Sequence, residues 1–331
     1  MKKILKSTSL FLLLSIGILI FTGIYFDIQR EKLETKYATG ASQFLDLPDG
    51  ARIHFRDEGK TDKPAIVLLH GFNGSLLNFE RLVPLLANNF RLVSLDLPGF
   101  GLTGATPNAD YTTKNYMDTV TSITNYLGIN KFSIAGNSMG GGVAWRYAIE
   151  YPSKVEGLIL LASSGVMTKE DRDRFEQRKD NSPIVWRLMG SSVIKKTLMY
   201  YTPRFFATQG LKASVFNQEL ATKEYARQFH DLTLLEGSRK AILSMGFGSR
   251  DRMYGPEIFK KIIAPTLVIH GKEDNIIGVE SSESFKKNIK HVEVKVYLDT
   301  GHLPMYEDPK RTANDIIKFL NIELNNSRSN E

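Results

Sequence analysis

Three residues that can together activate a hydroxyl nucleophile occur along this chain in the order Ser138, Asp274 and His302. A serine hydroxyl is too weak an acid to attack an ester unaided, so a histidine must accept its proton and a carboxylate must hold the neutral imidazole in the useful tautomer. Each of the three lies at or shortly after the end of a predicted strand. Because loops at the carboxyl ends of parallel strands gather at one edge of a sheet, we expect the three side chains to meet there.

Ser138 lies at the centre of a G-x-S-x-G pattern that runs from Gly136 to Gly140. A nucleophile turned sharply from a strand into a helix has a strained backbone, and the residues two before and two after it must lack side chains so that strand and helix can close together. The start of the helix then favours negative charge that develops on a substrate. Alone, the pattern is equally typical of a glycine-rich strand-to-helix turn.

Two further loops supply the context that this pattern needs. His70 and Gly71 follow the third predicted strand, and a DLPGFG run begins at Asp96 after the fourth. We interpret His70 as a polar residue that shapes its loop, because His302 already fills the role of base. Asp96 is expected to fix its own turn.

Asp299 competes with Asp274 for the role of carboxylate partner of the histidine. It lies three residues before His302, and a residue that close along one turn rarely reaches the far imidazole nitrogen, so Asp274 is favoured. The remaining histidines fit no ligand spacing and are interpreted as structural or surface residues: His54, His230, His270 and His291.

The surrounding sequence predicts an α/β fold. From Phe44 onward, short β-rich runs alternate with amphipathic stretches, as in a mostly parallel sheet with helices on both faces. The first two strands are expected to form a hairpin about Pro48-Asp49-Gly50. Eight strands are predicted, at 43–47, 52–56, 65–69, 91–95, 131–135, 157–161, 266–269 and 292–298. Helices are predicted at 76–87, 113–127, 139–151, 279–288 and 309–321.

Between residues 166 and 263 this alternation stops, in a stretch that is charged, helix-like and rich in aromatic residues. We therefore predict a helical cap, or lid, inserted after the sixth strand, with a core domain at 42–165 and 264–323 and a polar tail at 324–331. Aromatic residues of such an insertion more often form its own core than a ligand pocket, but a lid must also face whatever it covers.

The N-terminus predicts a membrane anchor at residues 1–29, followed by a polar tether at 30–41. Three lysines precede an apolar run at 10–26, which is about 25 Å long as a helix and marginally spans a bilayer core. A cleaved signal peptide would also begin this way, but no small residues mark a cleavage site near the end of the run. The lysines place the N-terminus in the cytoplasm, and the catalytic domain is then expected on the extracytoplasmic side.

Composition narrows the classes of function. The chain has 331 residues, no cysteine and a formal charge of +7, so thiol nucleophiles, disulfides and Cys-ligated metals are excluded. The charge is local, with 18 Lys/Arg against 11 Asp/Glu between residues 166 and 262 and a balance elsewhere. No nucleic-acid-binding motif accompanies it, so a nucleic-acid partner is not expected, whereas the basic cap could engage anionic lipid.

The chain resembles the α/β-hydrolase family over about residues 44–322. The resemblance rests on HGF (70–72), DLPGFG (96–101), GNSMGG beginning at Gly136, GKED (271–274) and GH (301–302). It implies Ser138 as nucleophile, His302 as general base and then acid, and Asp274 as the orienting carboxylate. It also implies an oxyanion hole formed by the backbone N–H groups of Phe72 and Met139, and a cap domain.

Within the family, the anchor and the GHLPMYEDP run are most similar to lipid-directed esterases of the monoacylglycerol-lipase type. This similarity implies a lipid or small ester substrate cleaved through an acyl-enzyme, with no metal and no organic cofactor; no protein partner is predicted. Carbon–carbon bond hydrolases share GNSMGG but usually carry Trp where this chain has Leu303. The same triad would also suit a proline-releasing peptidase of this fold, and a non-catalytic binding module is the least favoured hypothesis. Relatives that cleave epoxides or carbon–halogen bonds use Asp as nucleophile, which Ser138 argues against.

Overall fold

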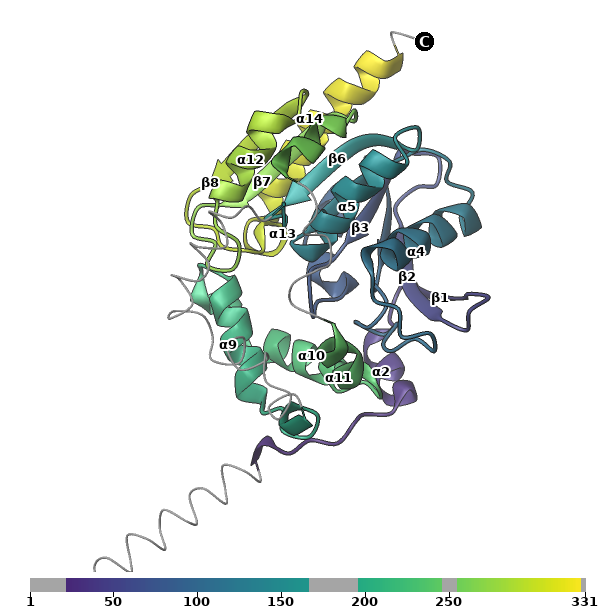
Figure 1. Ribbon diagram of the computed structural model, residues 1–331, viewed down its shortest axis with the longest axis vertical. Helices are drawn as coiled ribbons and strands as arrows, with labels where there is room; N and C mark the ends of the chain where they lie inside the picture. The colour runs from purple at the N-terminus through teal and green to yellow at the C-terminus, as the bar shows by residue number, and fades with distance from the viewer. Residues whose placement is uncertain (1–21, 167–195, 246–254, 329–331) are drawn as a thin grey trace, which may run out of the picture.

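The structure, a computed structural model, describes residues 22–166, 196–245 and 255–328, and side chains up to residue 323. It is built around an eight-stranded sheet of order β1-β2-β4-β3-β5-β6-β7-β8 (Figure 1). The β1–β2 and β2–β4 pairs are antiparallel, and every other neighbouring pair is parallel. The strands are β1 (Ser42–Asp46), β2 (Arg52–Glu58), β3 (Ala65–Leu69), β4 (Arg91–Leu95), β5 (Phe132–Asn137), β6 (Val155–Leu161), β7 (Thr266–Gly271) and β8 (Val292–Tyr297).

Helices cover both faces of the sheet, because alternate residues of the central strands enter two different hydrophobic clusters. Val67 and Ile134 belong to the cluster beneath α4 (Thr113–Tyr126), α5 (Met139–Glu150) and α12 (Glu280–Asn288). Ile66 and Ala135 belong to the cluster beneath α3 (Val83–Leu86), α13 (Pro304–Glu307) and α14 (Pro309–Arg328). A strand that buries both of its faces must be largely apolar, as β3 is over its whole length.

All eight predicted strands are present, and their ends shift by at most two residues from the predicted bounds. The hairpin of the first two strands is confirmed as the antiparallel β1–β2 pair. The helix predicted at 76–87 is instead broken into the 3₁₀ turn η1 (Leu76–Phe79) and α3. Pro84 lies at the start of α3, where it has no N–H to continue a preceding helix and its ring would clash with the carbonyl four residues back.

The described part of the cap is helical and lies beside the carboxyl ends of the strands (Figure 1). It contains α9 (Arg204–Ser214), η3 (Gln218–Leu220), α10 (Lys223–Thr233) and α11 (Ser238–Ser244). The predicted boundary at residue 263 differs from the structure, since η4 (Pro256–Lys261) packs into the core through Phe259. The ring of Phe259 contacts Trp145 and Phe285, at centroid distances of 5.0 and 4.6 Å.

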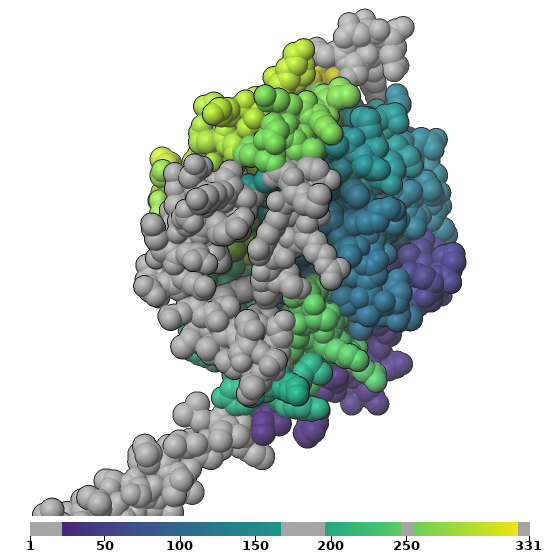
Figure 2. Space-filling model, in the orientation of Figure 1, coloured from purple at the N-terminus to yellow at the C-terminus, as the bar shows by residue number. Residues whose placement is uncertain are grey.

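Residues 22–37, which we call the N-terminal strap, are attached to the cap and the core. Ile28 donates to Leu234 O at 2.7 Å, and Asp27 forms an ion pair with Arg239. Figure 2 shows purple atoms of this part of the chain against green atoms of the cap at the lower edge of the molecule. The segment predicted to be a polar tether therefore differs from the structure, because Arg30–Tyr37 forms α2 and buries Leu33.

The predicted membrane anchor falls mostly on residues 1–21, which lie outside the described residues. Within the described ranges, none of the helices has both the length and the apolar character that a membrane span requires. The last residues of the predicted apolar run contact the cap instead, as Gly23 O accepts from Thr202 N at 2.8 Å and Tyr25 N donates to Tyr200 O at 3.2 Å.

Candidate active site

Ser138 lies on the sharp turn from β5 into α5, with φ 54° and ψ −117°. A positive φ is costly for a residue with a side chain and persists only where the surroundings enforce it. Two glycines allow the turn to close. A Cβ on Gly136 would lie 2.3 Å from the Gly140 carbonyl, and one on Gly140 would lie 2.4 Å from Leu69 O. The turn therefore presents Ser138 at the start of a helix, half-buried at the carboxyl edge of the sheet.

Asp274 and His302 meet as the sequence predicts. His302 Nδ1 lies 2.7 Å from Asp274 Oδ2, and both residues are buried. The other carboxylate oxygen, Oδ1, accepts from the backbone N–H groups of Ile276 and Ile277 at 2.8 and 2.9 Å. These donors fix the plane of the carboxylate, and through it the orientation of the His302 ring.

The charge state of Asp274 suits this arrangement. Burial by itself raises the pKa of a carboxyl group, but the charge of His302 and the hydrogen bonds from His270 and His302 outweigh it and hold the pKa of Asp274 well below its ordinary value. Asp274 is therefore an anion at neutral pH and keeps a proton on His302 Nδ1. The opposite ring nitrogen, Nε2, is then left as the basic one.

Asp299 does not take this role, because Asp274 makes the contact with His302 and Asp299 is exposed after β8. His270, by contrast, makes a contact with Asp274 that the sequence does not predict. It was interpreted as structural or surface, but its Nε2 lies 3.1 Å from Asp274 Oδ2. His270 lies near the end of β7 and Asp274 lies in the loop that follows. No sequence pattern at this spacing predicts a hydrogen bond between the two side chains.

The loop after β3 lies against the nucleophile turn. A Cβ on Gly71 would lie 3.1 Å from Ser138 Cβ, so glycine permits the close approach of the backbone that precedes Phe72. His70 is fully buried, with Nδ1 2.7 Å from Gly71 O and Nε2 accepting from Leu97 N at 3.0 Å. Burial lowers the pKa of His70, which agrees with a neutral imidazole that ties two loops together.

Asn137 and Asp96 fix the neighbouring loops. Asn137 Nδ2 donates to His302 O and to Leu161 O, each at 3.0 Å, so the residue before the candidate nucleophile holds the candidate base. Asp96 accepts from the backbone of Leu76 and Leu102 and lies 2.7 Å from a ring nitrogen of His54. These contacts agree with the interpretation of Asp96 as a turn-fixing residue.

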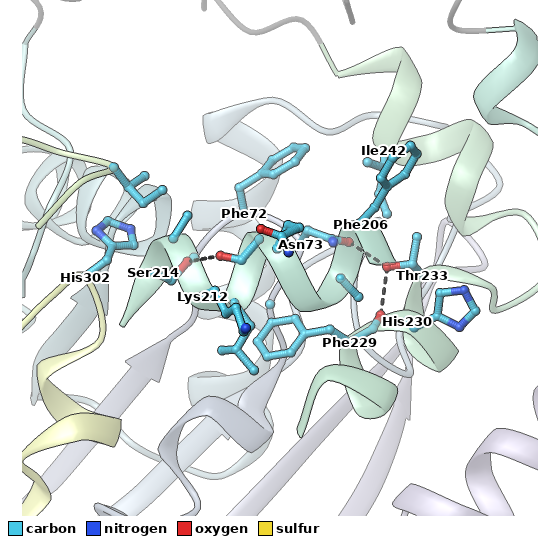
Figure 3. Close-up of a pocket in the computed structure, with 18 of the residues that line it drawn as sticks. Phe72, Asn73, Phe206, Lys212, Ser214, Phe229, His230, Thr233, Ile242 and His302 are labelled. Carbon is cyan, nitrogen blue, oxygen red and sulfur yellow. Dashed lines mark hydrogen bonds between the residues drawn. The ribbon is translucent and has the colours of Figure 1, made fainter. Parts of the chain in front are cut away.

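Ser138 and His302 line one cavity of about 730 Å³ that lies between the core and the cap. Aromatic side chains of α9 and α10, Phe206 and Phe229, line it from the cap, as Figure 3 shows. A hydrogen bond of 3.1 Å from Thr233 of α10 to Asn73 of the loop after β3 joins the two walls. The cavity has the size and the mixed apolar and polar lining of a small-molecule site.

A half-buried carboxylate joins the cap to the loop that carries His302. Glu307 of α13 accepts from Gly301 N at 2.8 Å and from the cap residues Phe216 and Asn217, through their backbone N–H groups, at 2.7 and 3.3 Å. His302 N also donates to Ser214 O at the end of α9, at 2.8 Å. Glu307 lies within the GHLPMYEDP run, but its contact with the cap could not be seen in the sequence.

Among the described residues, no cluster of histidine, aspartate and glutamate side chains has an arrangement that could hold a metal ion. The acid–base pair on the same cavity as Ser138 is Asp274–His302. The two residues can supply proton transfer to and from a hydroxyl nucleophile, with backbone donors at the start of α5 and in the loop after β3.

The strand order, the turn at Ser138 and the acid–histidine pair at the same sheet edge define an α/β hydrolase. The family model for the alpha/beta hydrolase fold matches residues 64–183 and 201–309. The chain belongs to this family.

The comparisons with known proteins connect the chain to hydrolases of more than one chemistry. It is 27% identical to monoacylglycerol lipase ABHD6 of Homo sapiens, over 78% of this chain and 75% of that protein. It is also 27% identical to the 2-hydroxy-6-oxo-6-(2'-aminophenyl)hexa-2,4-dienoic acid hydrolase of Metapseudomonas resinovorans, over 88% and 93% of the two chains. The crystal structure of a membrane phospholipase A matches with a TM-score of 0.70 and 26% identity, over 98% of this chain and all of that one.

Proposed function

We propose that this chain is a serine hydrolase that cleaves carboxylic esters of lipid-like substrates through an acyl-enzyme intermediate. The observation that carries the proposal is the Asp274–His302 pair, which lies with Ser138 on a cavity that the cap lines with aromatic side chains. The similarity to a monoacylglycerol lipase and to a membrane phospholipase A supports it.

The proposed reaction follows from this geometry. His302 Nε2 accepts the hydroxyl proton while Ser138 Oγ forms a bond to the ester carbon, and the carbonyl electron pair moves to the oxygen. We assign the stabilisation of that oxyanion to the backbone N–H groups of Phe72 and Met139, an effect worth about 3–4 kcal/mol per donor in comparable sites. Collapse expels the alcohol, which takes the proton from His302, and water then cleaves the acyl-enzyme by the same steps.

Carbon–carbon bond hydrolysis is the second candidate, because a relative named as a dienoic acid hydrolase is as similar in sequence as the lipase. The apolar lining from Phe206 and Phe229 favours an acyl chain over a small, charged dienoic acid. Parallel assays with a monoacylglycerol and with a vinylogous diketone acid separate the two. Faster turnover of the ester supports the proposal, whereas faster turnover of the diketone assigns the chain to the second class.

We further propose that the N-terminal region, residues 1–29, anchors the protein in a membrane through its apolar run, with the cap facing the bilayer and the catalytic domain outside the cytoplasm. Three lysines before an apolar run support this orientation. The described chain begins beside the outer end of the cap (Figure 1), so an anchor would leave from that side. Phe26, Tyr200 and Phe205 are exposed there, together with the basic residue Arg204.

The absence of cysteine makes this topology testable. Single cysteines at Lys2 and at the exposed Asp62 can be labelled in intact cells with a membrane-impermeant maleimide. Labelling of Asp62→Cys alone supports the proposed orientation. Labelling of Lys2→Cys alone reverses it, and release of the Asp62→Cys protein into the medium indicates cleavage.

A further inference from the structure

A second imidazole contacts the carboxylate of the catalytic pair. His270 lies on β7 and is fully buried. Its Nε2 is 3.1 Å from Asp274 Oδ2 and 3.0 Å from the carbonyl oxygen of Ile277. Its Nδ1 is 2.9 Å from the hydroxyl of Ser282, which is also buried, on α12.

These partners determine where the proton of His270 lies. A carboxylate and a carbonyl can only accept hydrogen bonds, so Nε2 of His270 must carry a proton. The Ser282 hydroxyl can donate, so Nδ1 can act as its acceptor while the ring stays neutral. His270 is therefore a donor to Asp274, and the two acceptors that face Nε2 are enough to select this tautomer without Ser282.

The consequence is that Asp274 Oδ2 is shared by two imidazoles. His302 Nδ1 approaches it at 2.7 Å and His270 Nε2 at 3.1 Å, while Oδ1 accepts from two backbone N–H groups. The titratable groups that face Asp274 in the described structure are thus His302, from the loop after β8, and His270, from β7. A donor on Oδ2 restrains the carboxylate and draws negative charge away from the hydrogen bond to His302.

We propose that His270 is a positioning residue of this site, which orients Asp274 toward His302 and shares the charge of its Oδ2 oxygen. The inference rests on the proposed function only in that Ser138, His302 and Asp274 act as a triad; it does not depend on the substrate. The alternative is a merely structural role, in which His270 only ties α12 to β7 through Ser282. An experiment must distinguish this role from the positioning role.

Two substitutions separate these roles, because each side-chain amide places its polar group near a different ring nitrogen. His270→Gln keeps a donor near the Nε2 position, toward Asp274, and loses the contact to Ser282. His270→Asn keeps a polar group near the Nδ1 position, toward Ser282, and loses the donor to Asp274. Ser282→Ala is the matched control, since it removes the tie to α12 and leaves the contact to Asp274 in place.

The readout is the rate at which a fluorophosphonate labels Ser138 in the full-length protein as a function of pH. This reagent reports activation of the serine without any assumption about the ester. For His270→Asn we expect a maximal rate about ten-fold lower. We also expect its acidic limb to move to higher pH, because a carboxylate with one donor fewer holds the proton on His302 more strongly. His270→Gln and Ser282→Ala should keep the profile of the wild type.

An unchanged profile for His270→Asn, or equal losses in the Asn and Gln variants, would overturn the inference while leaving the proposed function intact. A wild type that reacts no faster than Ser138→Ala would overturn both. Should His270→Asn not fold, ¹⁵N NMR of the histidine-labelled wild type tests the same point. A proton on Nε2 of His270 supports the inference, and an unprotonated Nε2 overturns it, since such a nitrogen has nothing to donate to Asp274.

Discussion

The two walls of the cavity are held in different ways. On the core wall, Ser138, Asp274 and His302 follow the parallel strands β5, β7 and β8, and short hydrogen bonds restrain the Asp274–His302 pair from several directions. The described cap wall is made of helices that reach the core through separate contacts, such as Thr233 to Asn73 and the Glu307 bridge. From this difference we expect substitutions in the core wall to affect the chemistry, and substitutions in the cap wall to affect which substrate is used.

Replacing Asp274, on the core wall, should cause the largest loss of activity. In Asp274→Asn, the Asn side chain has one acceptor oxygen where Asp274 has two. It can accept either from His302 Nδ1 or from the two backbone N–H groups, unless His302 changes its tautomer. We therefore expect kcat to fall about a thousand-fold or more. Steady-state kinetics with an activated ester measures this. Asp299→Asn is the matched control, because that carboxylate is exposed and makes no contact with His302 in the described structure. Equal losses in the two variants would contradict the assignment of the acid.

Replacing Glu307 should loosen the junction between the two walls. Glu307→Gln puts an amide NH₂ group opposite the backbone N–H of Gly301 or of Phe216, so at least one backbone donor loses its acceptor, at a cost of about 1 kcal/mol in the free energy of unfolding. Since the same contacts hold the His302 loop, we expect kcat/KM to fall about ten-fold. Denaturant unfolding and kinetics test both expectations. Glu273→Gln, at an exposed position nearby, should change neither.

Replacing an aromatic residue of the cap should change substrate preference and spare the chemistry. Phe206→Ala removes apolar surface from the cavity, so KM for long acyl chains should rise about ten-fold while short esters are little affected. Kinetics over a chain-length series shows the difference. Phe216 is an exposed aromatic residue that does not line the cavity, so Phe216→Ala should leave the chain-length dependence of KM unchanged. A change in that dependence would show that the substrate binds outside the proposed cavity.

The smallest effect on activity is expected from replacing Thr222, which is the N-cap residue of helix α10 and does not line the cavity. The Thr222 hydroxyl accepts from Tyr225 N at the start of α10, and Thr222→Ala should lower the free energy of unfolding by about 1 kcal/mol. Denaturant unfolding measures this loss, with Thr208→Ala inside α9 as the control. A large loss of ester hydrolysis in Thr222→Ala would show that cap stability and catalysis are not separable.

How much could be predicted from the sequence depends on whether a feature is set by local sequence or by contacts between distant elements. The strands and the Asp274–His302 contact were predictable because local patterns encode them: continuous apolar runs, glycines around Ser138, and an acid and a histidine after successive strands. His270, Glu307 and the N-terminal strap were not. Their partners lie on other elements, such as Ser282 of α12 or Phe216 of the cap, and such long-range hydrogen bonds follow from packing, which no local pattern records.

The claim that Ser138 forms an acyl-enzyme is tested most directly by trapping it. The full-length protein is mixed with a monoacylglycerol, quenched in acid and digested, and the peptide that contains Ser138 is weighed by mass spectrometry. The account predicts a mass increase equal to the acyl group on Ser138, which is absent when the same experiment is done with Ser138→Ala. Ester hydrolysis that continues in Ser138→Ala, or an acyl group found on another residue, would contradict it.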